Sequence, residues 1–203
     1  MDTSDEWIRG RTGIGQRHIA TGQETVSWMA AQAAKDALAN AGMEAEEIDL
    51  LLVSTMSGES IMPCTACQVQ ELIGAANATC FDLNGACTGF LLALNTAQAY
   101  LGQKIYTTVL VIGTEALSHL TNWQDRSTCV LFGDGAGAVV LKASEDASYS
   151  QVTHSIGKKG GALTCASRNQ PVFAEINADI TSTYMEMDGK EVFKFAVSKV
   201  PEA

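Results

Sequence analysis

The sequence predicts an α/β protein whose mainly parallel sheet is covered by helices on both sides. Short continuous apolar runs, typical of strands buried on both faces, alternate along the chain with longer segments of helical periodicity. This alternation favours right-handed crossovers, which place helices on the two faces of a parallel sheet. The 203 residues, 46% of them hydrophobic, match the size of a single domain spanning residues 1–203.

Six elements follow one another before the alternation ends. Helices are predicted where apolar residues recur every three to four positions and a glycine follows, and strands where apolar residues are continuous. In chain order we expect a helix at Thr25–Ala41, a strand at Ile48–Thr55, a helix from Pro63 to Gly74, a strand at Ala78–Leu83, a helix from Cys87 to about Leu101 and a strand at Thr107–Glu115.

The pattern changes after residue 116. Ser127–Ala143 contains two apolar runs joined by Gly133-Asp134-Gly135, which predicts an antiparallel hairpin. The Gly-x-Gly-x-Gly run is not interpreted as a dinucleotide-binding loop, because β-branched residues rather than a helix follow it. A polar connection at Ala143–Ser150, one strand after Gln151, a glycine-rich loop and a helix from about Gly189 complete the expected order.

Charge and hydropathy exclude several classes of partner. The formal net charge of −10 argues against nucleic acid, and no apolar run approaches the ~20 residues that span a bilayer. Asp2, Asp5 and Glu6 occupy the place of the basic segment that opens a secretory signal. We therefore expect a cytoplasmic protein with neither a membrane nor a nucleic-acid partner.

The six cysteines are scattered through apolar contexts, which favours reduced thiols over a disulfide scaffold. Cys64-Thr65-Ala66-Cys67 has the spacing of a redox or zinc motif. A zinc site would need a second ligand pair, and thioredoxin-like chemistry would need a different strand and helix context. Packing is the favoured interpretation of this pair, and no metal site is expected.

Cys87 is the candidate nucleophile. The strand at 78–83 turns sharply through Asn84-Gly85-Ala86 into a helix that is apolar on most faces and is therefore expected to be buried. A helix N-terminus offers free N–H groups and the positive end of the dipole, which favour the reactive thiolate. The N–H of Cys87 itself could donate to a thioester oxygen. Spacing alone leaves open that Cys87 is one more small core residue.

Five separated motifs make the chain resemble β-ketoacyl-acyl-carrier-protein synthase III, a thiolase-fold condensing enzyme. The motifs cover essentially the full length in the family's order, and they read DTSDEWIRGRTGI, PCTACQVQELIG, FDLNGACTGF, DRSTCVLFGDGAGAVVL and MDGKEVFKFAV. The resemblance implies a layered αβα fold with a mixed sheet around a central helix that carries Cys87. It also implies a decarboxylating condensation, in which Cys87 takes an acyl group, usually acetyl, from acyl-CoA and passes it to malonyl-acyl-carrier protein to initiate fatty-acid synthesis.

The same resemblance assigns roles to further residues. Trp7 and Arg126 match positions that sandwich the adenine of CoA, Thr3 one that contacts the ring, and Arg11 one near the CoA phosphates. The residues at acyl pocket or tunnel positions are Phe132, Met187 and Met62, the last reaching across a homodimer. The resemblance implies that the dimer forms through the strand at 107–115, and that acyl-CoA is a substrate, with no cofactor.

Some parts of the family's machinery have no counterpart here. The family uses a histidine and an asparagine to bind the malonyl thioester, and a late glycine N–H as second oxyanion donor. His18, His119 and His154 match no catalytic position, the last two being placed in a loop and a strand. We therefore expect half of a duplicated fold, truncated at both ends relative to the family, which exposes an apolar face and does not catalyse condensation alone.

Two alternatives remain open at this stage. One is a related thiolase-fold condensing enzyme, such as a starter enzyme of polyketide or quinolone synthesis or a hydroxymethylglutaryl-CoA synthase. The other is a catalytically incomplete fragment that serves as a binding subunit.

Overall fold

A computed structural model describes residues 3–145, 148–166 and 183–202. Asp2, which opens the first motif, and part of the polar connection at 143–150 lie outside these residues. The chain contacts define two compact units. The larger comprises His18–Ala116 and Gly133–Gln151, and the smaller comprises Met1–Arg17, Leu117–Phe132 and Val152–Ala203. The single domain at 1–203 stays a prediction.

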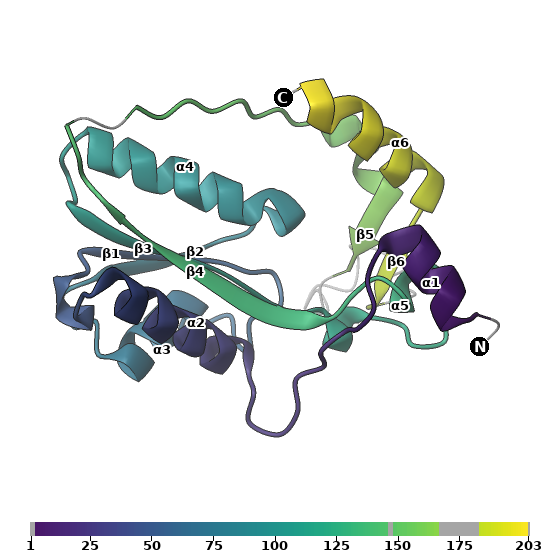
Figure 1. The fold of residues 1–203 in the computed structure, drawn as a ribbon, viewed down its shortest axis with the longest axis horizontal. Helices are drawn as coiled ribbons and strands as arrows, with labels where there is room; N and C mark the ends of the chain where they lie inside the picture. Colours follow the sequence, from purple (N-terminus) through teal and green to yellow (C-terminus); the bar gives the residue numbers. More distant parts are fainter. Residues whose placement is uncertain (1–2, 146–147, 167–182, 203) are drawn as a thin grey trace, which may run out of the picture. The chain divides into compact units, whose positions relative to one another are not determined.

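The larger unit is built on a four-stranded sheet in the order β2-β1-β3-β4 (Figure 1). The first three strands are parallel, with Leu50 opposite both Thr79 and Val109, and β4 runs antiparallel to β3. Every residue of β1 is buried, as its continuous apolar run predicts. The predicted strands at 48–55, 78–83 and 107–115 are confirmed as β1 (Leu50–Ser54), β2 (Thr79–Leu83) and β3 (Thr108–Ala116), and β4 spans Asp134–Lys142.

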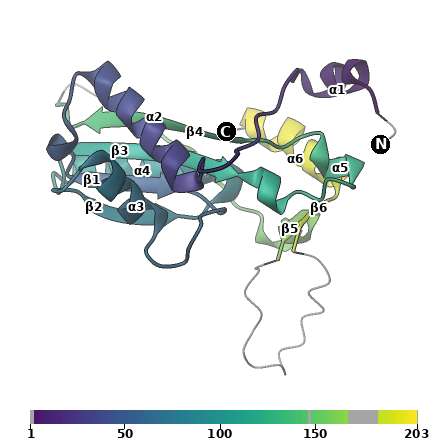
Figure 2. The same cartoon turned by 90° about the horizontal axis from the view of Figure 1, so that it is seen from below.

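Helices cover both faces of this sheet, as predicted. Helices α2 (Val26–Ala41) and α3 (Thr65–Ile73) lie side by side on one face, and α4 (Gly89–Gly102) lies on the other (Figures 1 and 2). Alternate side chains of β1 point to opposite faces of the sheet. Leu51 and Val53 pack with α2 and α3, and Leu50 and Leu52 pack with α4. The layered α/β fold is therefore confirmed.

The hairpin predicted at Ser127–Ala143 is wrong. Its first part forms the short helix α5 (Arg126–Cys129) and the turn that follows, and the helix begins where the Asp125 side chain accepts a hydrogen bond from the Ser127 N–H. Its second run is β4, which pairs with β3 over nine residues instead of folding back on its neighbour. The edge of β3 supplied a longer row of backbone partners than a local hairpin would. The glycines at 135 and 137 lie within β4, so no helix follows them.

The strand assigned to the dimer interface is also corrected. Strand β3 lies inside the sheet, with β1 hydrogen-bonded to one edge and β4 to the other. It therefore has no free edge with which to pair with a second copy.

The helix after Cys87 begins later and is less buried than predicted. A 3-10 turn, η2 (Ala86–Thr88), carries Cys87, and the α-helix starts at Gly89. Residues at a spacing of four, from Gly89 to Leu101, are buried, but Leu91 and Leu92 are 56% and 37% exposed. Only one side of α4 is covered among the described residues, so the expectation of an exposed apolar face is confirmed.

The smaller unit consists of short elements. Strands β5 and β6 pair antiparallel, and the helix predicted from Gly189 is confirmed as α6. His119 lies in a 3-10 turn rather than a loop, and no strand includes His154. The elements are α1 (Asp5–Thr12), η3 (Leu117–Leu120), α5, η4 (Gly157–Ala162), β5 (Leu163–Cys165), β6 (Met185–Met187), α6 (Gly189–Lys199) and η5 (Val200–Glu202), while η1 (Ala45–Glu47) belongs to the larger unit.

Within the described ranges, no helix has both the length and the hydropathy needed to cross a membrane.

Candidate active site

The Cys87 thiol is exposed at a sharp turn between β2 and α4. Ala86, the residue before it, has a φ of +47°, in the left-handed region that L-amino acids other than glycine rarely occupy. Strain of this kind persists only where the surroundings impose it, and it is concentrated at functional sites. Cys87 directly precedes Thr88, the N-cap of α4. The turn therefore presents the sulfur beside the start of the helix, as an elbow does.

Two glycines allow this turn to lie close to the sheet. A Cβ at Gly89 would lie 2.1 Å from Ser54 Oγ at the end of β1, and one at Gly85 would lie 2.9 Å from the Cα of Gly89. Both distances are shorter than atoms tolerate, so no side chain separates α4 from β1 or the turn from the start of α4. The position of Cys87 is thus set by the packing of helix against strand.

A second feature at the carboxyl end of the parallel strands is the connection between β1 and α3. The Glu115 carboxylate accepts hydrogen bonds from the Met56 N–H at 3.0 Å and from the Ser57 hydroxyl. Glu59 accepts from the N–H and the hydroxyl of Ser27 at 2.8 and 2.9 Å. Burial raises the pKa of Glu115, although these donors oppose the shift. Two carboxyl groups therefore hold the connection that carries Met62.

Met62 is 85% exposed at the tip of this connection. It does not line either of the two hollows that surround Trp7. A large apolar side chain left this open on a connection held by hydrogen bonds is available to a partner.

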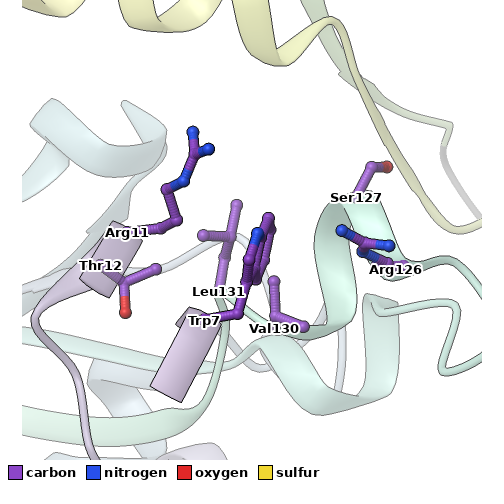
Figure 3. A pocket seen from close by; sticks show the side chains of 7 residues that line it. All are labelled: Trp7, Arg11, Thr12, Arg126, Ser127, Val130 and Leu131. Atoms are coloured by element: carbon purple, nitrogen blue, oxygen red, sulfur yellow. The ribbon is translucent and has the colours of Figure 1, made fainter. Parts of the chain in front are cut away.

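The smaller unit contains a hollow of about 380 Å3 around the Trp7 indole. The Arg126 guanidinium carbon lies 4.6 Å from the centre of the indole ring, and that of Arg11 lies 5.6 Å away. Figure 3 shows Trp7 standing between these two side chains, which come from α1 and α5. Three of the predicted nucleotide-binding residues are thus brought together. The lining consists of Trp7, Arg11, Thr12, Arg126, Ser127, Val130 and Leu131.

Local hydrogen bonds explain why α1 and α5 present these side chains. The Ser4 hydroxyl accepts from the Trp7 N–H at 3.1 Å at the start of α1. At the start of α5, Asp125 accepts from the N–H and the hydroxyl of Ser127 at 2.9 and 2.7 Å. The Ser127 hydroxyl is the main cause of the lowered pKa of Asp125.

An adjoining hollow of about 430 Å3 shares Trp7 and Arg11 and is also lined by Ser4, Glu6 and Gly10. Thr3 lines neither hollow, but its hydroxyl oxygen is buried without a hydrogen-bond partner among the described residues. A buried polar atom of this kind is a candidate contact for a ligand.

Sequence reasoning missed four residues of the first hollow: Thr12, Ser127, Val130 and Leu131. The available signal was their spacing, because each lies one, four or five positions after Arg11 or Arg126. Phe132 and Met187 are both half-buried, and neither lines either of the two hollows around Trp7. His18 contributes only its carbonyl, which accepts from the Asp134 N–H at 2.8 Å. Among the described residues, no group of histidine, cysteine and acidic side chains is arranged to hold a metal ion.

Known proteins resemble this chain in sequence and in fold. The profile of the family described as 3-oxoacyl-[acyl-carrier-protein (ACP)] synthase III matches residues 81–160. The chain is 45% identical to a β-ketoacyl-[acyl-carrier-protein] synthase III of Clostridium botulinum (strain Okra / Type B1) and 49% identical to one of Synechococcus elongatus. Each match covers 100% of this chain and 62% of the relative, so the chain spans about three fifths of these proteins.

Two solved structures are similar over almost the whole chain. The 3-oxoacyl-[acyl-carrier-protein] synthase III of Aquifex aeolicus VF5 gives a TM-score of 0.83 at 43% identity, over 99% of this chain and 61% of that one. The priming β-ketosynthase of the R1128 polyketide pathway gives a TM-score of 0.88 at 38% identity, over 100% and 60%.

The layered sheet, the helix after Cys87 and these neighbours define a protein of the thiolase-like fold class. Within that class, residues 81–160 match the synthase III family model, and the whole chain is similar to about three fifths of β-ketoacyl-acyl-carrier-protein synthase III.

Proposed function

We propose that the chain carries the acyl-transfer centre of a condensing enzyme that initiates fatty-acid synthesis in the cytoplasm, with Cys87 as the acyl acceptor. The observation that carries this proposal is the exposed Cys87 thiol on a strained turn at the start of α4. A nucleophile presented by a strand-to-helix turn is accessible from solvent while its backbone is fixed by the core.

The first half-reaction is a transthioesterification. The Cys87 thiolate attacks the carbonyl carbon of acyl-CoA, here acetyl-CoA, and forms a tetrahedral intermediate. The CoA sulfur then leaves and takes up the proton that Cys87 has lost, so one thioester replaces another. The backbone N–H of Cys87 is the proposed donor to the oxyanion of this intermediate.

The second half-reaction requires malonyl-acyl-carrier protein and groups that match no position of this chain. Loss of carbon dioxide from the malonyl group gives a carbanion, which attacks the Cys87 thioester and releases the thiolate. In this proposal Phe132 and Met187 line the acyl path, and Met62 closes the pocket of the other subunit in a homodimer. The exposure of Met62 supports that last assignment.

The Trp7 hollow is the proposed site for the nucleotide of acyl-CoA, which acts as a substrate, and no cofactor is assigned. An adenine between Trp7 and Arg126 needs two van der Waals gaps, or about 7 Å between the flanking groups. The Arg126 guanidinium carbon lies 4.6 Å from the ring, so this side chain must swing away to admit the base. Arg11 supplies charge for the phosphates, and Thr3 has a hydroxyl without a partner among the described residues.

Incubation with radiolabelled acetyl-CoA, followed by digestion after Asp and Glu, tests the proposal. The peptide Leu83–Glu115 contains Cys87 and no other cysteine, so its label reports this residue. We expect label on this peptide in the native chain and in Cys165→Ala, the matched control because Cys165 is also exposed, and none in Cys87→Ala. Equal labelling of Cys165, or CoA binding with no label at all, would contradict the proposal, and the latter would identify a binding module.

A second candidate is a priming ketosynthase of polyketide synthesis, favoured by the similarity to the R1128 enzyme. The same assay with a series of acyl-CoA starters distinguishes the two. Preference for acetyl-CoA supports fatty-acid initiation, and preference for longer or branched starters supports the second candidate.

A further inference from the structure

Three thiols meet at the start of α3, outside the residues assigned to acyl transfer. Cys64 is the N-cap of α3, and Cys67 is the third residue of the helix. The Cys64 and Cys67 thiols share a hydrogen bond, with the two sulfurs 3.4 Å apart. Cys80 on β2 contacts Cys67 from the sheet. N-cap and third-residue side chains lie next to each other at a helix start, which explains why a Cys-x-x-Cys spacing brings the sulfurs together.

We propose that Cys64 and Cys67 are a redox pair, converted to a disulfide by exchange with a low-molecular-weight disulfide such as glutathione disulfide. This modification site is independent of acylation at Cys87. A disulfide bond is about 2.05 Å long, so the sulfurs must approach by the remainder of the 3.4 Å between them, about 1.4 Å. A movement of that size is on the scale of side-chain rotation and leaves α3 in place.

The exchange balances in two steps. One Cys thiolate attacks a sulfur of glutathione disulfide, which forms a mixed disulfide and releases one glutathione thiolate. The second Cys thiolate then attacks the protein sulfur of the mixed disulfide and releases the other glutathione. The two cysteines lose two electrons and two protons, and one glutathione disulfide becomes two glutathione thiols.

Asp82 determines how this pair reacts. Its carboxylate oxygens accept from the Thr65 and Ala66 N–H groups at 2.8 and 2.7 Å, so a carboxylate already occupies the start of the helix. In reactive Cys-x-x-Cys sites these N–H groups stabilise the thiolate instead. The hydrogen bond shared with the Cys64 thiol, burial and the charge of Asp82 raise the pKa of Cys67. Oxidation is therefore slow, and because the thiolate is not stabilised, the disulfide persists once formed.

Cys80 lies beside the pair but is not part of the proposed disulfide. Burial, followed by the neighbouring sulfurs, raises the pKa of Cys80 to about 12, so it remains a thiol at neutral pH. Its thiol donates to the Ala78 carbonyl oxygen at 3.5 Å. The neighbouring third sulfur is thus a matched control for the pair.

The test is incubation of the full chain in glutathione redox buffers, alkylation of the remaining thiols and digestion after Glu. The peptide Ser60–Glu71 contains Cys64 and Cys67 and no other cysteine. We expect its mass to fall by two hydrogens as the buffer becomes oxidising, with neither sulfur alkylated, and to recover on reduction. The native chain supplies this readout even if a variant fails to fold.

Single substitutions test which cysteines form the disulfide. Cys80→Ser is expected to keep the intrapeptide disulfide, whereas Cys64→Ser and Cys67→Ser are expected to lose it and to accumulate a mixed disulfide with glutathione. Asp82→Asn is expected to speed oxidation severalfold at pH 7. A peptide that stays fully alkylated while Cys87 and Cys165 become oxidised would overturn the proposal. So would a disulfide between Cys67 and Cys80.

Discussion

The elbow at Cys87 packs against β1, in which every residue is buried, whereas the hollow around Trp7 is built by α1, which has no buried residue, and by the short helix α5, which buries Thr128 and Cys129. Contacts of Gly89 with Ser54 and the left-handed backbone of Ala86 fix the elbow. The hollow depends on hydrogen-bonded helix starts and on cations stacked against one exposed ring.

Substitutions in these two regions are therefore expected to have different effects. A change at the elbow alters core packing, so it is expected to change the free energy of unfolding together with the position of the Cys87 sulfur. A change in the hollow alters surface interactions, so it is expected to change ligand affinity while the unfolding free energy stays nearly constant.

The largest expected effect is at Gly89. Gly89→Ala places a Cβ 2.1 Å from Ser54 Oγ, and we expect a loss of about 3 kcal/mol in the free energy of unfolding, measured by urea denaturation. Gly102→Ala, in the last turn of the same helix with no atom within 4 Å, is the control and is expected to be neutral or to gain up to about 1 kcal/mol. Equal losses in both variants would show that the close approach does not matter. Adding Ser54→Gly to Gly89→Ala should restore part of the loss.

Trp7→Ala tests the expectation for the hollow. Loss of the stacking surface is expected to weaken CoA binding about tenfold, within the ~0.5–2 kcal/mol range of cation–π interactions, as measured by titration calorimetry. The free energy of unfolding should change by less than about 0.5 kcal/mol, because Trp7 is 38% exposed and its helix has no buried residue. Trp28→Ala, at a similarly exposed tryptophan of the larger unit, should leave CoA binding unchanged. A large loss of unfolding free energy in Trp7→Ala would show that the hollow, like the elbow, depends on core packing.

A smaller effect is expected at the start of α5. Asp125→Ala removes the acceptor for both Ser127 donors and should cost about 1 kcal/mol in unfolding free energy, whereas Asp125→Asn keeps an N-cap and should cost less. Because the pKa of Asp125 is lowered in the folded chain, its contribution is present above the ordinary carboxyl pKa and is lost as the pH falls through the lowered value. Urea denaturation between pH 2 and 7 should therefore show the difference from Asp125→Ala shrinking in acid. A difference that does not vary with pH would refute the role of the ionised cap.

The smallest expected effect concerns Glu115, whose pKa is shifted in the opposite direction. Burial raises this pKa, so the folded chain binds the proton more tightly, and the associated stability is lost as the pH rises through the folded value. Glu115→Gln retains the shape without the charge, and its stability relative to the native chain is expected to increase from pH 4 to pH 7.5 in urea denaturation. A trend in the other direction would mean that the donors at Met56 and Ser57 outweigh burial.

Much of the larger unit was predictable because its signals are local. Continuous apolar runs identified β1 and β3, and Gly42 and Gly74 marked the ends of α2 and α3, where both have positive φ. The elbow at Cys87 was visible as a strand, small residues and a helix in succession. The positions of these elements depend on side-chain burial, which the residue pattern encodes directly.

The errors fall where a distant segment competes with a local one. The second run of 127–143 pairs with β3 rather than with its neighbour, because the β3 edge offered nine residues of ladder. The same pairing removed the free edge that the proposed dimer strand needed. Thr12, Ser127, Val130 and Leu131 entered the hollow only because α1 and α5 meet in space.

The sequence by itself determined the alternation of helices and strands, the resemblance to a known family and the cysteine at the turn, since each depends on the identity and spacing of neighbouring residues. Only the tertiary structure decided which strand edges are paired, how far Arg126 lies from Trp7, and that Cys80 adjoins Cys67. The physical reason is that edge pairing, ring stacking and thiol contact join residues that are separated along the chain. Their energies depend on distances that a one-dimensional pattern does not contain.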